Sequence, residues 1–177
     1  ASSWGDYDND GDLDLYVTNS TKGTSTNLLF RNDSGTFAEI GATAGLDDVS
    51  DSQVPAWADY DLDGDVDLYL TNNNDGNKLY RNDGNMIFAD VTATPLNISN
   101  GHQGAAWADY DSDGDPDLYV ASYSGASSMF RNDGNGTFVD VIGISINDSG
   151  SGATAVGWAD YDNDADFDLF VAMDGSA

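Results

Sequence analysis

Aspartate occupies every second position in one short stretch of this sequence. Residues 59–67 read DYDLDGDVD, with five aspartates and a glycine at position 64. If the backbone curls, the carboxylates at the first, third and fifth positions converge on one point. The glycine permits the sharp turn, the seventh residue offers its carbonyl oxygen and the ninth closes the shell. Calcium takes six to eight hard oxygen ligands at about 2.3–2.6 Å in adaptable geometry. The stretch therefore predicts a calcium-binding loop.

The same pattern occurs four times, in loops that begin about 50 residues apart. We expect up to four calcium ions, held by the aspartates of these loops. The predicted ligands are Asp6, Asp8, Asp10, Asp12, Asp14, Asp59, Asp61, Asp63, Asp65, Asp67, Asp109, Asp111, Asp113, Asp115, Asp117, Asp160, Asp162, Asp164, Asp166 and Asp168. In the fourth loop Ala165 replaces the glycine. If this position needs a positive φ, alanine costs about 1 kcal/mol or more there, so the fourth loop is expected to bind calcium most weakly.

Other interpretations of the aspartates fit less well. Aspartates also occur as turn formers and as solvated surface charges. In four clusters this dense, however, the carboxylates would repel one another strongly without a cation. Magnesium demands a tighter octahedron, while zinc and copper prefer histidine or cysteine, and the chain has one histidine and no cysteine. An EF-hand would need a glutamate at the twelfth position and flanking helices. The twelfth residues of the four loops are Val17, Leu70, Val120 and Val171.

The composition of the chain excludes several classes of protein. Its 177 residues include 5 Lys and Arg against 32 Asp and Glu, for a formal net charge of −27. Such a chain repels nucleic acids and anionic membrane surfaces. Hydrophobic residues make up 40% and aromatic residues 11%, which is too much core material for a disordered tail. The sequence contains no apolar run of the length that spans a membrane.

Each repeat contains four short segments that are typical of strands. In the second repeat these are VPAWADY (54–60), DLYLTN (67–72), KLYR (78–81) and FADVTA (88–93), and an Asn-Asp-Gly turn follows the third. No helical periodicity of useful length is present. Four antiparallel strands in a repeat of this length are typical of a β-propeller blade, so we expect an all-β fold.

The number of repeats predicts how the blades are arranged. We expect a single repeat array over 1–177, with blades at about 1–45, 53–96 and 102–146 and a half blade at about 152–177. Closed propellers contain roughly 4–8 blades. About three and a half blades therefore predict an open, non-closed array.

Two motifs of the repeat carry a family resemblance. The pattern W-(G/A)-D-Y-D-x-D-G-D-x-D-L-Y-V, followed by (F/Y)-R-N-D-G-x-x-F, resembles the FG-GAP/VCBS-type repeats. These occur in integrin α-subunit propellers and in bacterial secreted proteins similar to cartilage acidic protein. The resemblance implies that each aspartate loop joins the first and second strands of a blade and holds calcium. It also implies an extracellular, calcium-stabilised propeller that acts in adhesion or surface assembly. It does not imply an enzyme. Ala165 and the final half blade depart from the family pattern.

Tryptophan and arginine also recur once per repeat. Each tryptophan stands two residues before a loop, where we expect packing between blades, with sugar binding as the alternative. These residues are Trp4, Trp57, Trp107 and Trp158. Three arginines share one position of the repeat, where we expect buried or half-buried side chains that pair with neighbouring aspartates or carbonyl oxygens, with a ligand-binding ring of arginines as the alternative. They are Arg31, Arg81 and Arg131.

The sequence contains no recognisable catalytic constellation. The only histidine, His102, has no adjacent serine or cysteine nucleophile, and we expect it to cap a loop. The leading hypothesis is therefore a non-enzymatic, extracellular or cell-surface protein with a structural or adhesive role. No catalytic or cofactor-binding residues other than the calcium ligands are predicted.

The open array has implications for partners. Each blade needs neighbours to cover its apolar faces, so an open array has two adhesive ends that differ from each other. Contacts between unlike ends are heterologous and generate rings or open filaments. We expect a homo-oligomer or a head-to-tail fibre. The alternative is a piece of a larger closed propeller that acts as a lectin-like or protein-binding module. An extracellular protein or a glycan is a further possible partner, whereas nucleic acid binding and membrane insertion are not expected.

Overall fold

The strands form successive sheets along the chain. The computed structural model describes all residues except 22, 100, 135, 142–151 and 175–177. The first sheet comprises β1 (Ser2–Gly5), β2 (Asp14–Val17), β3 (Leu28–Asp33) and β4 (Thr36–Glu39). The second comprises β5 (Ser52–Ala58), β6 (Asp67–Asn72), β7 (Lys78–Asn82) and β8 (Phe88–Asp90). The third comprises β9 (His102–Ala108), β10 (Asp117–Ser122), β11 (Ser128–Asn132) and β12 (Phe138–Asp140). An end hairpin comprises β13 (Ala153–Ala159) and β14 (Asp168–Met173).

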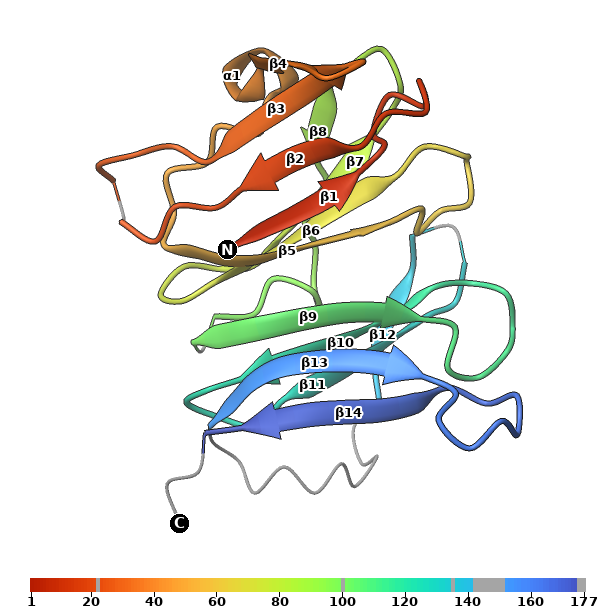
Figure 1. The fold of residues 1–177 in the computed structure, drawn as a ribbon. Helices are drawn as coiled ribbons and strands as arrows, with labels where there is room; N and C mark the ends of the chain where they lie inside the picture. The colour runs from red at the N-terminus through yellow and green to blue at the C-terminus, as the bar shows by residue number, and fades with distance from the viewer. Residues whose placement is uncertain (22, 100, 135, 142–151, 175–177) are drawn as a thin grey trace.

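The sheets are stacked in chain order, with the first sheet at one end and the end hairpin at the other (Figure 1). Within each sheet the strands are antiparallel and lie side by side in sequence order. The described strands do not close into a ring. The prediction of an all-β, open array of four-stranded blade-type sheets is confirmed. The predicted boundary between the third blade and the half blade, near 146–152, falls largely outside the described residues.

The second strands of the two middle sheets, β6 and β10, are buried on both faces. All six residues of β6 are buried. Because side chains alternate along a strand, Leu68 and Leu70 join the core shared with the first sheet, whereas Tyr69 joins the core shared with the third. This explains why the DLYL segments read as nearly continuous apolar runs. In β14 the same alternation leaves Phe170 71% exposed, while Leu169 still packs against the third sheet.

A segment after the first sheet covers its second strand. It contains the short helix α1 (Gly41–Ala44), which ends at Gly45 with a φ of 78°. The hydroxyl of Tyr16 donates a hydrogen bond to the carbonyl oxygen of Leu46 at 3.0 Å. The corresponding Tyr69 donates to Leu96 O at 3.0 Å after the second sheet. Among the described residues, no helix has the length and apolar character needed to cross a membrane.

Trp57, Trp107 and Trp158 pack between sheets, as predicted, whereas Trp4 on β1 is 53% exposed and has no sheet packed against it among the described residues. The indole Nε1 of Trp107 donates to the carbonyl oxygen of Ala56 in the preceding sheet at 3.2 Å. The ring of Trp107 stacks on Tyr60 at 6.4 Å, with an interplanar angle of 18°. Trp158 repeats the hydrogen bond to Ala106 O at 3.3 Å.

The prediction for the three arginines is confirmed, whereas the prediction for the histidine is not. Each of the three repeated arginines pairs with the aspartate two residues further on, as expected. The pairs are Arg31–Asp33, Arg81–Asp83 and Arg131–Asp133. The prediction that His102 caps a loop is wrong. His102 begins β9, pairs in register with Ser122 and is 2% exposed, because the strand continues past a bulge.

Candidate metal centres

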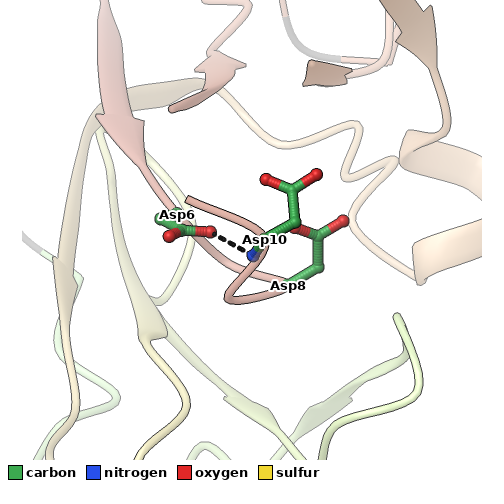
Figure 2. A group of neighbouring side chains, drawn as sticks. All are labelled: Asp6, Asp8 and Asp10. Atoms are coloured by element: carbon green, nitrogen blue, oxygen red, sulfur yellow. Dashed lines mark hydrogen bonds between the residues drawn. The ribbon is translucent and has the colours of Figure 1, made fainter. Parts of the chain in front are cut away.

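Each aspartate-rich loop joins the first and second strands of its sheet. In the first loop the chain leaves β1 at Gly5 and enters β2 at Asp14. Figure 2 shows Asp6, Asp8 and Asp10 on the curled backbone between these strands. The remaining loops lie between β5 and β6, between β9 and β10, and between β13 and β14. The four loops thus occupy equivalent positions in successive sheets.

Backbone hydrogen bonds to the aspartates hold the curl. The carboxylate of Asp6 accepts from the amide nitrogen of Asp10 at 3.1 Å and from that of Gly11 at 3.0 Å. The carboxylate of Asp10 accepts from the amide of Asp12 at 2.8 Å. The other three loops repeat all three bonds. The curl therefore follows from the aspartate spacing itself.

In the first three loops the ninth residue is a buried anchor. Asp67 is 1% exposed and accepts from the amide nitrogens of Tyr60 at 3.1 Å and Asn82 at 2.8 Å. Burial nevertheless raises the pKa of Asp67 to about 7, and that of Asp117 to about 6. Burial likewise raises the pKa of Asp14. A cation at this position would offset the cost of burying these charges.

Three carboxylates converge in every loop. In each set, one oxygen from each residue lies within 4.8 Å of the others. The sets are Asp6, Asp8 and Asp10; Asp59, Asp61 and Asp67; Asp109, Asp111 and Asp117; and Asp160, Asp162 and Asp168. This spacing suits hard oxygen ligands around one cation.

The third residue of the loop supplies a second indication of a cation. The Oδ1 atoms of Asp8 and Asp61 are buried and have no hydrogen-bond partner. Burial, reinforced by neighbouring carboxylates, raises the pKa of both residues. A buried acceptor without a donor is costly unless an ion coordinates it. The residues present therefore fit a hard divalent cation such as calcium.

The carboxylates of the seventh residues lie outside these clusters. Asp12 accepts from the backbone amide and hydroxyl of Ser34 at 2.7 and 3.1 Å. Asp65 accepts from Nδ2 of Asn9 in the preceding loop at 2.7 Å. These side chains tie the loops to their surroundings, which leaves the backbone carbonyl as the atom that position seven would offer to a metal.

The fourth loop differs from the others in two respects. Ala165 has a φ of 76°, where Gly11, Gly64 and Gly114 have values of 92°, 98° and 100°. The position thus requires the left-handed conformation that alanine disfavours. In addition, Asp168 accepts from the amide of Tyr161 at 2.9 Å, but the described residues include no third strand beside β14 to supply a second amide.

Sequence reasoning missed the asparagine that completes the anchor. The amides of Asn32, Asn82 and Asn132, on the third strands, each donate to the ninth aspartate of their loop at 2.8 Å. The side chains of Asn82 and Asn132 also donate to the carbonyl oxygens of Tyr7 and Tyr60 in the preceding sheet, at 2.7 and 2.8 Å. The Arg-Asn-Asp motif repeats in register with the loops, and that register was the available signal.

Comparison with known proteins places these loops in a family. A search of curated proteins gave no match. The family model described as FG-GAP-like repeat matches residues 6–70, 59–120 and 109–171. Each match begins at the first aspartate of one loop and extends past the next loop, so the matches together span nearly the whole chain. FG-GAP repeats are typical of extracellular proteins. The chain belongs to the FG-GAP-like repeat family.

Proposed function

We propose that this chain is an extracellular, calcium-stabilised repeat module with a structural or adhesive role, and that its copies associate through the open ends of the array. The observation that carries the calcium part is the carboxylate cluster of the second loop, formed by Asp59, Asp61 and Asp67. There the anchor Asp67 is buried and Asp61 has a buried oxygen without a donor. Both features favour a cation ligated by carboxylates.

Calcium would be held by the converging carboxylates of each loop, together with the carbonyl oxygen of the seventh residue. When bound, it supplies positive charge against a formal net charge of −27. The chain's own contribution is to curl the loop before binding, through the backbone bonds to the first and fifth aspartates. Since an ion that binds only the folded state stabilises that state, calcium would add to the free energy of unfolding.

We infer an extracellular location from the family and from the plentiful free calcium outside cells, which would fill even weak sites. Sites of modest affinity, with dissociation constants of about 10⁻⁴–10⁻³ M, are typical of extracellular modules. The role that we propose is also non-enzymatic. The only histidine, His102, is buried in β9, and the described part of the chain shows no hydrogen-bonded pair of a nucleophile with this histidine as base.

A second candidate function is a protein-binding or lectin-like module within a larger closed propeller. The observation that favours it is the end hairpin, whose two strands lack the third and fourth strands of the other sheets among the described residues. In this alternative, further blades would cover the ends of the array.

Thermal unfolding tests the calcium proposal. The melting temperature should rise when calcium is added to chelator-treated protein, and rise much less with the same concentration of magnesium. Isothermal titration should resolve up to four sites. If calcium leaves the melting temperature unchanged and produces no binding heat, the proposed stabilisation is wrong. Glycan arrays and sedimentation velocity then separate the lectin-like from the self-associating role.

A further inference from the structure

One aromatic arrangement recurs wherever two sheets meet. At each junction a tryptophan from the first strand of the later sheet lies edge-on to the aromatic ring of the second strand of the earlier one. The three pairs are Tyr16–Trp57 at 6.2 Å, Tyr69–Trp107 at 6.2 Å and Tyr119–Trp158 at 6.5 Å, with interplanar angles of 81°, 86° and 89°. The junction between sheets is thus a repeated unit of the structure.

The second junction shows the full receiving site for a tryptophan. Trp107 stacks on Tyr60, meets Tyr69 edge-on and donates to Ala56 O. Tyr60 and Tyr69 are 4% and 0% exposed. Ala56 on β5, Tyr69 on β6 and Tyr60 in the loop between them therefore form a socket that the indole ring fills.

The end hairpin carries the same socket without a tryptophan in it. By their place in the repeat, Gly157, Tyr161 and Phe170 correspond to Ala56, Tyr60 and Tyr69. They line an open cavity of about 610 Å³. Tyr60 and Tyr69 are buried in the filled junction, whereas Tyr161 is 78% and Phe170 71% exposed. We call this cavity, lined by Gly157, Trp158, Ala159, Tyr161, Asp168, Leu169 and Phe170, the end socket.

The opposite end of the array carries the matching aromatic pair, Trp4 and Phe37, which we call the plug. Trp4 corresponds to Trp107 and is 53% exposed. It already meets Phe37 at 6.3 Å, as Trp107 meets Phe138 at 6.1 Å in the filled junction. Phe37 is 48% exposed, whereas Phe138 is 9% exposed. The tryptophan and phenylalanine of the plug are therefore arranged before any partner arrives.

We propose that Trp4 of one copy of this chain fills the end socket of a second copy. The inference rests on the self-association proposed above and assigns its interface. By analogy with the second junction, the indole Nε1 would donate to the carbonyl oxygen of Gly157 and the ring would pack against Tyr161 and Phe170. The side chain of Asn32, which donates to Leu13 O at 3.0 Å, would also reach Tyr161 O, as Asn132 reaches Tyr60 O.

A second copy is the occupant that the structure favours. Plug and socket lie at opposite ends of the stack, so they cannot meet within one chain as described (Figure 1). They are also the two halves of a junction that the chain already makes internally. Because plug and socket are different surfaces, the contact is heterologous and each added copy leaves one of each free.

A polar contact at the loops agrees with this pairing. Asn9 bridges the first junction by donating to Asp65 of the next loop at 2.7 Å. The fourth loop again has an asparagine at this position, Asn163, whereas the second and third loops have Leu62 and Ser112. In the proposed contact Asn163 would face Asp12 of the second copy, the counterpart of Asp65. The two calcium loops would then lie close together, so association should require calcium to reduce their repulsion.

Complementary variants provide the test, read by sedimentation velocity in calcium over a range of protein concentrations. Trp4→Ala removes the plug and keeps the socket, whereas Tyr161→Ala removes contacts of the socket and keeps the plug. Each variant alone should associate more weakly than wild type by about tenfold or more. Mixed together, they should form one-to-one dimers that do not extend, because each supplies what the other lacks.

Controls separate the possible failures. Ile87→Ala changes another exposed apolar side chain, 60% exposed, and should associate like wild type. Circular dichroism and thermal unfolding should show that all variants fold, and Phe170→Ala offers a second socket variant if Tyr161→Ala does not. Wild-type protein that stays monomeric at every concentration overturns both the proposed self-association and this interface. Association that neither variant weakens overturns the interface alone and points to another contact, such as strand addition at β14.

Discussion

The backbone amide of Asn82, on β7, donates to Oδ1 of Asp67, the last residue of the second loop, at 2.8 Å. This bond links the third strand of a sheet to the metal loop between its first and second strands. The side chain of the same asparagine reaches Tyr7 O in the preceding sheet. A single residue therefore joins the loop, its own sheet and the neighbouring sheet, which explains why occupancy of the loop should affect the stability of the whole array.

The raised pKa of Asp67 predicts how stability depends on pH without metal. The native carboxyl binds its proton up to about pH 7, whereas an unfolded aspartate loses it near 3.8. Because the native state binds more protons in this window, the free energy of unfolding should fall as pH rises from 4 to 7 in chelator. Urea denaturation of the His102→Gln variant measures this, since that variant removes the histidine titration. Stability that rises with pH in chelator would contradict the assignment.

Asp61→Asn should remove most of the calcium response of one loop. The substitution replaces the ligand whose Oδ1 is buried without a donor, and it weakens repulsion by Asp63 and Asp59 in the empty loop. In saturating calcium the free energy of unfolding should fall by about 1–3 kcal/mol relative to wild type. In chelator it should stay equal or rise slightly. Asp140→Asn, which removes one exposed carboxylate outside the loops, controls for net charge and should behave like wild type in both conditions.

Ala165→Gly should strengthen the fourth loop. Ala165 has a φ of 76°, and glycine adopts this conformation without a Cβ penalty, so the free energy of unfolding should rise by about 1 kcal/mol. The matched reverse variant is Gly114→Ala. Its added Cβ would meet no atom within 4 Å, so the cost would be conformational and similar in size. Calcium titration of the two variants should show opposite shifts in affinity, and equal affinities would show that the glycine position does not govern binding.

Two tryptophans in the same position of the repeat should respond differently to truncation. Trp107→Ala empties a filled junction and should lower the free energy of unfolding by about 3 kcal/mol or more. Trp4→Ala removes a half-exposed side chain and should change the stability of the monomer by about 0.5 kcal/mol or less. Urea denaturation at low protein concentration compares them. Similar losses in both variants would mean that Trp4 is already part of a core within the monomer.

His102 should make the array sensitive to acid. Burial lowers its pKa from 6.5 to about 4. The unfolded chain therefore binds this proton more readily between those values, and the free energy of unfolding should fall as pH drops from 6.5 to 4. In saturating calcium the loss should be about 1–3 kcal/mol larger for wild type than for His102→Gln. Identical pH profiles for the two proteins would exclude a buried, neutral histidine.

The repeated motifs explain why so much of this structure was predictable. The spacing of the aspartates defines the loops, and alternation in segments such as DLYL defines strands that lie between two cores. Contacts between repeats were harder to anticipate. Nothing in the local pattern around Asn82 shows that its amide meets Asp67, or that its side chain crosses to another sheet. His102 was misplaced for a related reason, since its burial depends on pairing with Ser122 across a bulge.

The alternation of side chains along β6 has a consequence for how the array comes apart. Leu68 belongs to the core on one side of the second sheet and Tyr69 to the core on the other. Detaching a middle sheet would open two cores at once, whereas detaching an end sheet opens only one. Loss of structure should therefore begin by fraying at the two ends and move inward. A partner that covers an end would stabilise that end against fraying.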